Sequence, residues 1–171
     1  MKAFSRILGT IVLFFVAFFL IGVFVPSVSY DIEIEIDRPA NEVFPALTDS
    51  ELSPKWIRGL ISSALVHGEV GKPGSKYTMT IDRSGRAETF EETIIQSKPD
   101  SILVYSMESQ GLLGNVVIKL QKHSESTRVF VSTTLRGKVW FTRSFLPLFK
   151  KSIKDTNLKD YLTLKSVLES T

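Results

Sequence analysis

Glu92 is the side chain whose type and surroundings best fit a chemical role. It stands between Phe90 and Ile94 in a stretch, residues 87–97, that alternates as a β-strand does. A period of two places these three side chains on one face of the strand. A carboxyl group in an apolar pocket has a raised pKa and can act as an acid, a base or a ligand's hydrogen-bonding partner. Because Ile95 makes the facing ambiguous, the plainer interpretation is that Glu92 points to solvent or pairs with an arginine.

The remaining reactive residue types do not form a known motif. His67 and His123 have no Ser, Asp or Glu partner at motif spacing, and we expect both to be structural or solvated. The absence of cysteine excludes disulfides, thiol nucleophiles, iron–sulfur clusters and cysteine-based zinc sites. No nucleophile elbow, phosphate loop or metal-binding motif occurs in the sequence. We therefore assign no catalytic residue, no metal and no cofactor.

The charge balance argues against nucleic-acid binding. Lys2 and Arg6 belong to the apolar N-terminal region, so the rest of the 171-residue chain holds 19 basic and 18 acidic groups. Binding to phosphates needs concentrated positive charge, and this body is close to neutral despite a pI near 9.1.

The first thirty residues predict a segment that targets the chain to a membrane. Residues 7–25 are uncharged and mostly Ile, Leu, Val and Phe. As a helix they would span about 28 Å, close to the thickness of the hydrocarbon core of a bilayer. Pro26 ends the predicted helix, and Tyr30 is of a type suited to the membrane interface.

Two interpretations of this segment remain open. With Lys2 and Arg6 before the run and acids after it, the positive-inside rule keeps the N-terminus cytoplasmic and exports the domain as a single-pass protein. Alternatively, Ser27 and Ser29 supply the small residues for signal cleavage before Tyr30, and the domain is secreted. The run is longer than a usual signal core, which favours a retained anchor over residues 1–29 and a domain over residues 30–171.

Beyond the anchor the patterns predict an α+β domain. Two short helices are expected near residues 41–47 and 49–56. Strands are expected at residues 30–37, 60–69, 76–82, 87–97, 101–108, 115–122 and 127–137. From Leu146 to Leu168 the apolar residues fall on one arc of a helix. This order is typical of helices packed on one face of an antiparallel sheet.

The soluble part resembles the START-like, or SRPBCC, superfamily of polyketide cyclase/dehydrase and lipid-transport proteins, which includes the Bet v 1-like proteins. The motifs that carry the resemblance are IEIDRPANEVF at 34–44, LTD at 47–49, LSPKW at 52–56, GKPGSKY at 71–77, ETFEETI at 88–94, KPD at 98–100 and Leu164-Lys165. The resemblance implies a helix-grip fold, in which a curved antiparallel sheet of about six to seven strands wraps around the long C-terminal helix. It also implies an apolar cavity between the two.

A cavity of this kind would use residues from several elements. We expect Met79, Phe90, Tyr105 and Phe130 on the strands that face the helix. Trp56 would lie at the cavity mouth or simply pack on the core, and Asn157 would bind a ligand head group or satisfy a neighbouring backbone group. The predicted ligand-binding residues are therefore Trp56, Met79, Phe90, Glu92, Tyr105, Phe130 and Asn157.

Three functions are compatible with these observations. The first is a membrane-anchored START-like domain that binds a lipid-like or other hydrophobic small molecule. The second is a cyclase/dehydratase-type enzyme with Glu92 or Tyr105 in proton transfer. The third is a domain with a filled interior that serves protein–protein contact. A continuous cavity of about 300 Å³ or more favours the first over the third. The sequence does not specify the oligomeric state.

Overall fold

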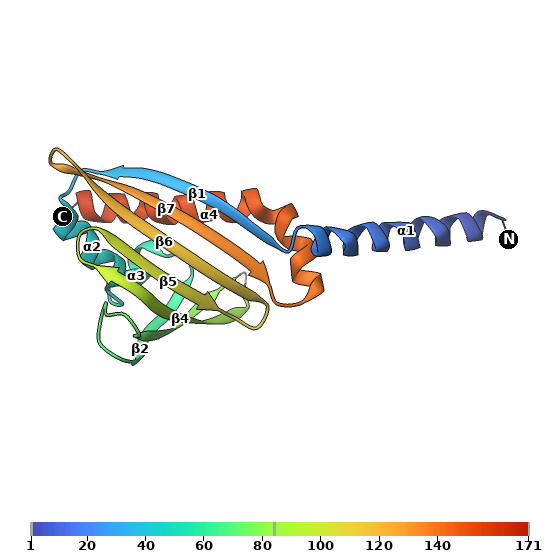
Figure 1. Ribbon diagram of the computed structural model, residues 1–171, viewed down its shortest axis with the longest axis horizontal. Coiled ribbons are helices and arrows are strands. Elements are labelled where there is room, and N and C mark those ends of the chain that lie inside the picture. Colours follow the sequence, from blue (N-terminus) through green and yellow to red (C-terminus); the bar gives the residue numbers. More distant parts are fainter. Residues whose placement is uncertain (1, 84, 171) are drawn as a thin grey trace.

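The N-terminal helix stands apart from the rest of the chain. The computed structural model describes residues 2–83 and 85–170, and helix α1 (Lys2–Phe24) projects from one end of a globular domain (Figure 1). Its segment Arg6–Phe24 has 19 residues with a mean hydropathy of 2.9, and almost none of it is buried. The predicted helix is therefore present and ends before Pro26. It is long and apolar enough to cross a membrane.

The domain is built on one antiparallel sheet of seven strands. Their order across the sheet is β1-β7-β6-β5-β4-β3-β2. The strands are β1 (Ser27–Ile36), β2 (Leu60–His67), β3 (Lys76–Asp82), β4 (Ala87–Lys98), β5 (Ile102–Glu108), β6 (Leu112–His123) and β7 (Ser126–Gly137). Each matches a predicted strand to within three residues at either end. The α+β fold class predicted from the sequence is confirmed.

Strand β1 follows α1 after only two residues and shows how alternation sets the inner face. Its side chains alternate without a break between exposed and buried from Ser27 to Ile36, and it pairs with β7 along this whole length. Tyr30 is buried in the core. The expectation that Tyr30 lies at the membrane interface is therefore wrong, because Tyr30 shares the inner face of β1 with Ile32, Ile34 and Ile36.

The antiparallel order fixes which loops share an end of the sheet. The start of β1 at Ser27 lies at the same end as the finish of β7, β5 and β3 and the start of β6, β4 and β2. This end, which we call the anchor end, therefore carries the β3–β4 and β5–β6 turns and the entry to α4. The other end carries the β2–β3, β4–β5 and β6–β7 connections.

Three helices cover the inner face. Helix α2 (Ala40–Thr48) and the single turn α3 (Ser53–Trp56) close the interior beside β6, β7 and β2. The long helix α4 (Trp140–Glu169) lies against β1 and β7 (Figure 1). Its C-terminal end is fixed there, because Lys165 Nζ donates to Glu35 O at 2.6 Å and Arg38 Nε donates to Leu168 O at 3.0 Å. The sheet and α4 together form the helix-grip architecture.

The apolar interior is divided into two clusters. The larger one joins β1, β7, β6, α2 and α4 around Ile36, Val129 and Leu164. The smaller one consists of Leu60, Met79 and Phe90 on β2 to β4. Helix α4 packs on the first cluster only, so the space in front of the second is not filled by the helix.

Helix α1 also touches the domain, through the first turns of α4. The Phe18 ring lies 4.8 Å from that of Phe145 and 6.3 Å from that of Phe141, measured between centroids. At Gly22 the two helices approach so closely that an added Cβ would lie 2.9 Å from the backbone oxygen of Trp140. Only glycine allows this approach.

The contact at Gly22 can be tested against a second glycine of the same helix. Gly22→Ala should lower the stability of the full chain by about 1–3 kcal/mol, because the backbones of α1 and α4 must separate. Gly9→Ala adds the same methyl group where nothing lies within 4 Å, and should leave stability unchanged. Thermal unfolding in detergent micelles, followed by circular dichroism, measures both. Equal midpoints for the two variants would contradict the packing described here.

Candidate functional site

The unfilled space between the sheet and the helices is a cavity of about 600 Å³. This is twice the volume set above for a ligand-binding cavity. Its walls come from the inward faces of β3 to β7, from α3 and from the middle of α4. The apolar lining consists of Leu47, Ile57, Met79, Ile81, Phe90, Ile94, Leu103, Met107, Leu112, Val116, Ile118, Leu135, Phe149 and Ile153. The interpretation of the domain as one with a filled interior is therefore wrong.

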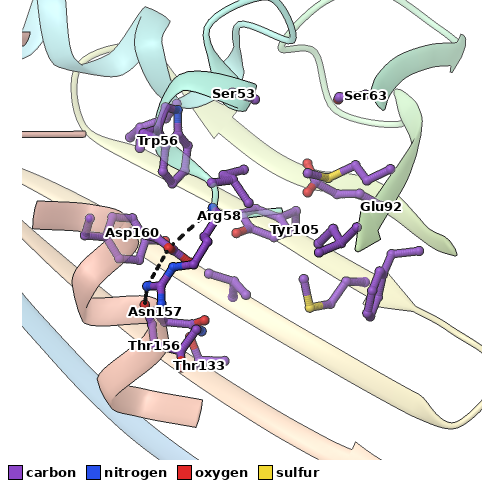
Figure 2. A pocket seen from close by; sticks show the side chains of 18 of the residues that line it. Ser53, Trp56, Arg58, Ser63, Glu92, Tyr105, Thr133, Thr156, Asn157 and Asp160 are labelled. Carbon is purple, nitrogen blue, oxygen red and sulfur yellow. Dashed lines mark hydrogen bonds and ion pairs between the residues drawn. The ribbon is translucent and has the colours of Figure 1, made fainter. Parts of the chain in front are cut away.

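Glu92 points into this cavity from the middle of β4 (Figure 2). Across the sheet it is paired with Tyr77 on β3 and Met107 on β5, both of which also line the cavity. The interpretation that Glu92 faces solvent is wrong, because β4 is an interior strand. The ambiguity came from Ile95, where a bulge between Ile94 and Gln96 interrupts the alternation.

The surroundings of Glu92 favour its neutral form. Burial raises the pKa of its carboxyl group to about 7, and no opposite charge offsets this cost. Among the described residues no hydrogen bond or ion pair reaches the carboxyl group. Near neutral pH it can therefore either donate or accept a proton.

Two tyrosines form a second polar feature in the cavity wall. The side chains of Tyr105 on β5 and Tyr161 on α4 approach each other here, and each hydroxyl group shifts the pKa of the other. Burial raises the pKa of both hydroxyl groups, and the nearby Glu92 raises them further. Both therefore stay protonated and serve as hydrogen-bonding groups rather than as bases.

Trp56 contributes a donor that has no acceptor within the described part of the chain. Its ring lies 5.7 Å from that of Tyr161 between centroids, and its side chain is more than nine-tenths buried on the cavity wall. The indole Nε1–H is buried and has no hydrogen-bond partner among the described residues. A buried donor in this state is costly, and an acceptor on a bound molecule would satisfy it.

Asn157 has a partner within the protein. Its Nδ2 donates to the hydroxyl group of Tyr30 at 2.5 Å. The side chain lines the cavity all the same. Asn157 therefore pairs with a side chain, where the sequence left a choice between a ligand and a backbone group.

The cavity mouth lies at the anchor end of the domain. Arg58, just before β2, extends its guanidinium group to Asp160 Oδ1 at 3.3 Å and to Thr156 O at 3.4 Å on α4 (Figure 2). Burial raises the pKa of the Asp160 carboxyl group, while Arg58 opposes this shift. Asp82 and Arg83 line the opening from the β3–β4 turn. Two cations, Arg58 and Arg83, and two acids, Asp82 and Asp160, therefore line this part of the cavity.

Six of the seven residues predicted from the sequence lie together around the cavity: Trp56, Met79, Phe90, Glu92, Tyr105 and Asn157. Phe130 does not. It lies on the outer face of the sheet beside Val117 and Lys119, because Val129 and Val131 take the inner positions of β7. Tyr161 and Arg58 were missed. Tyr161 lies on the apolar arc predicted for the C-terminal helix. A hydroxyl group on that arc was the signal that could have identified Tyr161 as a site residue.

The comparisons with known proteins agree with this architecture. The sequence profile described as "Activator of Hsp90 ATPase homolog 1-like protein" matches residues 37–144, more than half of the chain. No curated protein matches the sequence. The structure is also similar to solved structures, three of which are compared below. The family match and the structural similarity both confirm the resemblance to the START-like superfamily.

The three solved structures share the fold at low sequence identity. Ara h 8.0201 has a TM-score of 0.69 at 18% identity, covering 85% of this chain and 99% of its own. Zhui aromatase/cyclase, from a Streptomyces species, has a TM-score of 0.70 at 10% identity, covering 84% and 94%. A conserved protein from Geobacillus kaustophilus has a TM-score of 0.65 at 16% identity, covering 84% and 96%. At these identities the likeness establishes the fold.

The raised pKa of Glu92 predicts a pH dependence of stability. The folded state holds a proton on Glu92 up to about pH 7, whereas the unfolded chain releases it near pH 4.5. Stability should therefore fall as the pH rises through this window and level off above it, by up to about 3 kcal/mol. Glu92→Gln should remove this loss, and the variant should unfold at a higher temperature than the native chain at pH 8.

Glu91→Gln is the matched control, because Glu91 is the exposed neighbour on the outer face of β4. It should keep the pH dependence of the native chain. Unfolding midpoints measured between pH 4.5 and 8.5 separate the three proteins. A native chain with the same slope as Glu92→Gln would show that Glu92 is hydrated rather than buried.

Proposed function

We propose that this chain, which belongs to the Activator of Hsp90 ATPase homolog 1-like protein family within the START-like superfamily, binds a hydrophobic small molecule close to a membrane. The observation that carries the proposal is the apolar cavity of about 600 Å³ with a few inward polar groups. Small-molecule sites are typically concave and mostly apolar, with few polar groups that fix the orientation of the ligand.

The polar groups in the cavity define the chemistry of the ligand. Trp56 supplies an unsatisfied donor, and the neutral carboxyl group of Glu92 both donates and accepts. A bound carboxylate or phosphate would find no buried cation beside Glu92 among the described residues. The ligand is therefore an uncharged or weakly polar molecule, largely hydrocarbon, with an oxygen atom that accepts from the Trp56 indole. Lipid-like molecules meet this description.

Helix α1 is the proposed membrane anchor. Its 19-residue apolar segment is exposed except near its contact with α4, where Gly22 is buried and Phe18 half-buried, and apolar surface on this scale is stable only in lipid or against another protein. Lys2 and Arg6 precede it and acids follow in β1, which orients the N-terminus to the cytoplasm and the domain, residues 30–171, to the exported side. Tethering then raises the effective concentration of the domain at the bilayer.

The first residues of β1 support retention of the anchor over cleavage. Cleavage before Tyr30 would remove Ser27 to Ser29, which pair with Thr134 to Arg136 on β7. It would also remove Val28, which is buried in the main core. The loss would expose the edge of β7 at the anchor end, so we place the protein in the membrane rather than in the secreted fraction.

A cyclase or dehydratase activity is the second candidate function. The observation that favours it is the group formed by Glu92, Tyr105 and Tyr161 inside an apolar cavity, with a carboxyl pKa of about 7. Such a carboxyl group can take a proton from a carbon acid and return it to a leaving hydroxyl group. The similarity to an aromatase/cyclase structure is compatible with this chemistry.

Bound ligands distinguish a carrier from an enzyme. Full-length native protein and Glu92→Gln are purified from the same cells in amphipol, and their small molecules are compared by mass spectrometry. A carrier should hold the same molecule in both proteins. A dehydratase should accumulate in Glu92→Gln a molecule heavier by one water than that in the native protein, and this result would replace the carrier function with the enzymatic one.

Two neighbouring valines test the cavity itself. Val116 lines the cavity, whereas Val117 lies on the outer face of the same strand. Val116→Phe should weaken binding of the uncharged fluorescent lipid methyl cis-parinarate by tenfold or more, because the ring occupies ligand space. Val117→Phe should bind as the native chain does. Energy transfer from Trp56 to the probe measures the affinity, in full-length protein held in amphipol with Trp140→Phe as background. Equal affinities for the two variants would overturn the proposed site.

A further inference from the structure

The first turns of α4 present an unusual apolar surface to the outside of the domain. We define it as Val139, Trp140, Phe141, Phe145, Leu148 and Phe149 and call it the α4 apolar surface. All of these except Phe145 are between 51% and 59% exposed. A soluble domain rarely gathers so many exposed aromatic and aliphatic side chains on consecutive turns, and such patches mark sites of interaction.

The position of this surface along α1 identifies what covers it. Phe18 precedes the last residue of α1, Phe24, by six positions, which is about 9 Å along the helix axis. Yet Phe18 contacts Phe141 and Phe145, and Phe19 lies 5.9 Å from Trp140 between ring centroids. The start of α4 therefore lies beside the final two turns of α1 rather than beyond its end (Figure 1).

If α1 spans a bilayer, whatever packs against its final two turns lies within that bilayer. We propose that the α4 apolar surface is inserted in the outer part of the same bilayer, so that the cavity opens at the lipid surface. The inference rests on the proposed anchoring of α1 and adds a second membrane contact to it. The depth of about 9 Å matches that of interfacial helices, which bury their apolar face by about 5–10 Å.

The polar groups of this region are arranged as an apolar environment requires. Thr142 Oγ1 donates to Gly111 O at 3.0 Å, and Ser144 Oγ donates to Trp140 O at 3.1 Å. Arg143 turns back on the chain, where Nε donates to Gly137 O at 3.0 Å. Lipid offers few partners to such groups, so their satisfaction within the protein lowers the cost of insertion.

The cavity mouth adjoins the inserted surface. Phe149 belongs to both, since it lines the cavity and its ring lies 5.9 Å from that of Phe145. The other mouth residues, Arg58, Asp82 and Arg83, lie at the anchor end of the sheet, the end from which α1 leaves. An apolar ligand therefore passes from the bilayer along Phe145 and Phe149 into the cavity without crossing water.

Two tryptophans, in different places, allow a direct test. Full-length Trp56→Phe keeps Trp140 as its single tryptophan, and Trp140→Phe keeps Trp56. Both are reconstituted in phosphatidylcholine vesicles with and without bromine on the acyl chains. Bromine should lower the emission of Trp140 at least twofold, and that of Trp56, inside the domain, by much less.

A third protein reports on the anchor by itself. Phe18→Trp in a chain that also carries Trp56→Phe and Trp140→Phe places the only indole in α1. If this indole is quenched and Trp140 is not, the inference fails while the proposal that α1 is an anchor is supported. In that case, a blue-shifted emission of the unquenched Trp140 would indicate that a protein partner covers the α4 apolar surface. If neither is quenched, both the anchor and the inference fail. Failure of the native chain to bind methyl cis-parinarate, with Trp140 still quenched, would overturn the ligand-binding proposal alone.

Ligand loading tests the position of the mouth. Leu148→Asp places a charge on the α4 apolar surface and should slow transfer of methyl cis-parinarate from vesicles at least fivefold, with the affinity in amphipol unchanged. Leu162→Asp is the matched control, because Leu162 is exposed on a later turn of α4. Equal transfer rates for both variants would show that the ligand enters from water and would overturn the lipid-facing mouth.

Discussion

The cavity exists because the one long helix of the domain, α4, covers only part of the inner face of a seven-stranded curved sheet. Helix α4 packs on β1 and β7 and is held there at its C-terminal end by Lys165 and Arg38. It cannot also fill the space in front of β3 to β5, where Met79 and Phe90 belong to a separate small cluster. Filling that space would require larger side chains or a helix across the middle of the sheet. The chain has instead only the short turn α3, which closes the cavity at Trp56.

This incomplete packing determines the behaviour of the polar groups that face the cavity. In a filled core Glu92 would be too costly to bury without a cation. In a cavity the carboxyl group of Glu92 loses most of its hydration, but one side of it still faces open space. Its pKa therefore rises to about 7, and burying the group does not disrupt the strand. The unpaired indole Nε1–H of Trp56 likewise lies at the cavity wall and not in a filled core. Folded proteins normally pair buried polar groups with hydrogen-bond partners. Two unpaired groups in one cavity are typical of a functional site, which is kept at a cost in stability.

Local periodicity predicted the strands and, for most of the site residues, the face of the sheet on which the side chain lies. β3 alternates cleanly, so Met79 was placed on the inner face correctly. Phe130 was misplaced because both faces of β7 carry apolar residues, and only the strand's pairing shows that Val129 and Val131 point inward. The pairing of Tyr105 with Tyr161 joins residues far apart in the chain, so no local pattern could reveal it. The cavity was expected from family resemblance and not from periodicity.

Helix α1 and the cavity are mechanically linked through α4. Only Val25 and Pro26 separate α1 from β1, so the domain cannot turn freely about the end of the helix. The close approach at Gly22 fixes α1 against the first turns of α4, whose later turns form the cavity wall through Ile153 and Tyr161. A long flexible linker would raise local concentration while leaving the mouth free to face any direction. Here α4 contacts α1 at one end and forms a wall of the cavity in its middle, so the orientation of the cavity mouth relative to α1 is built into the fold.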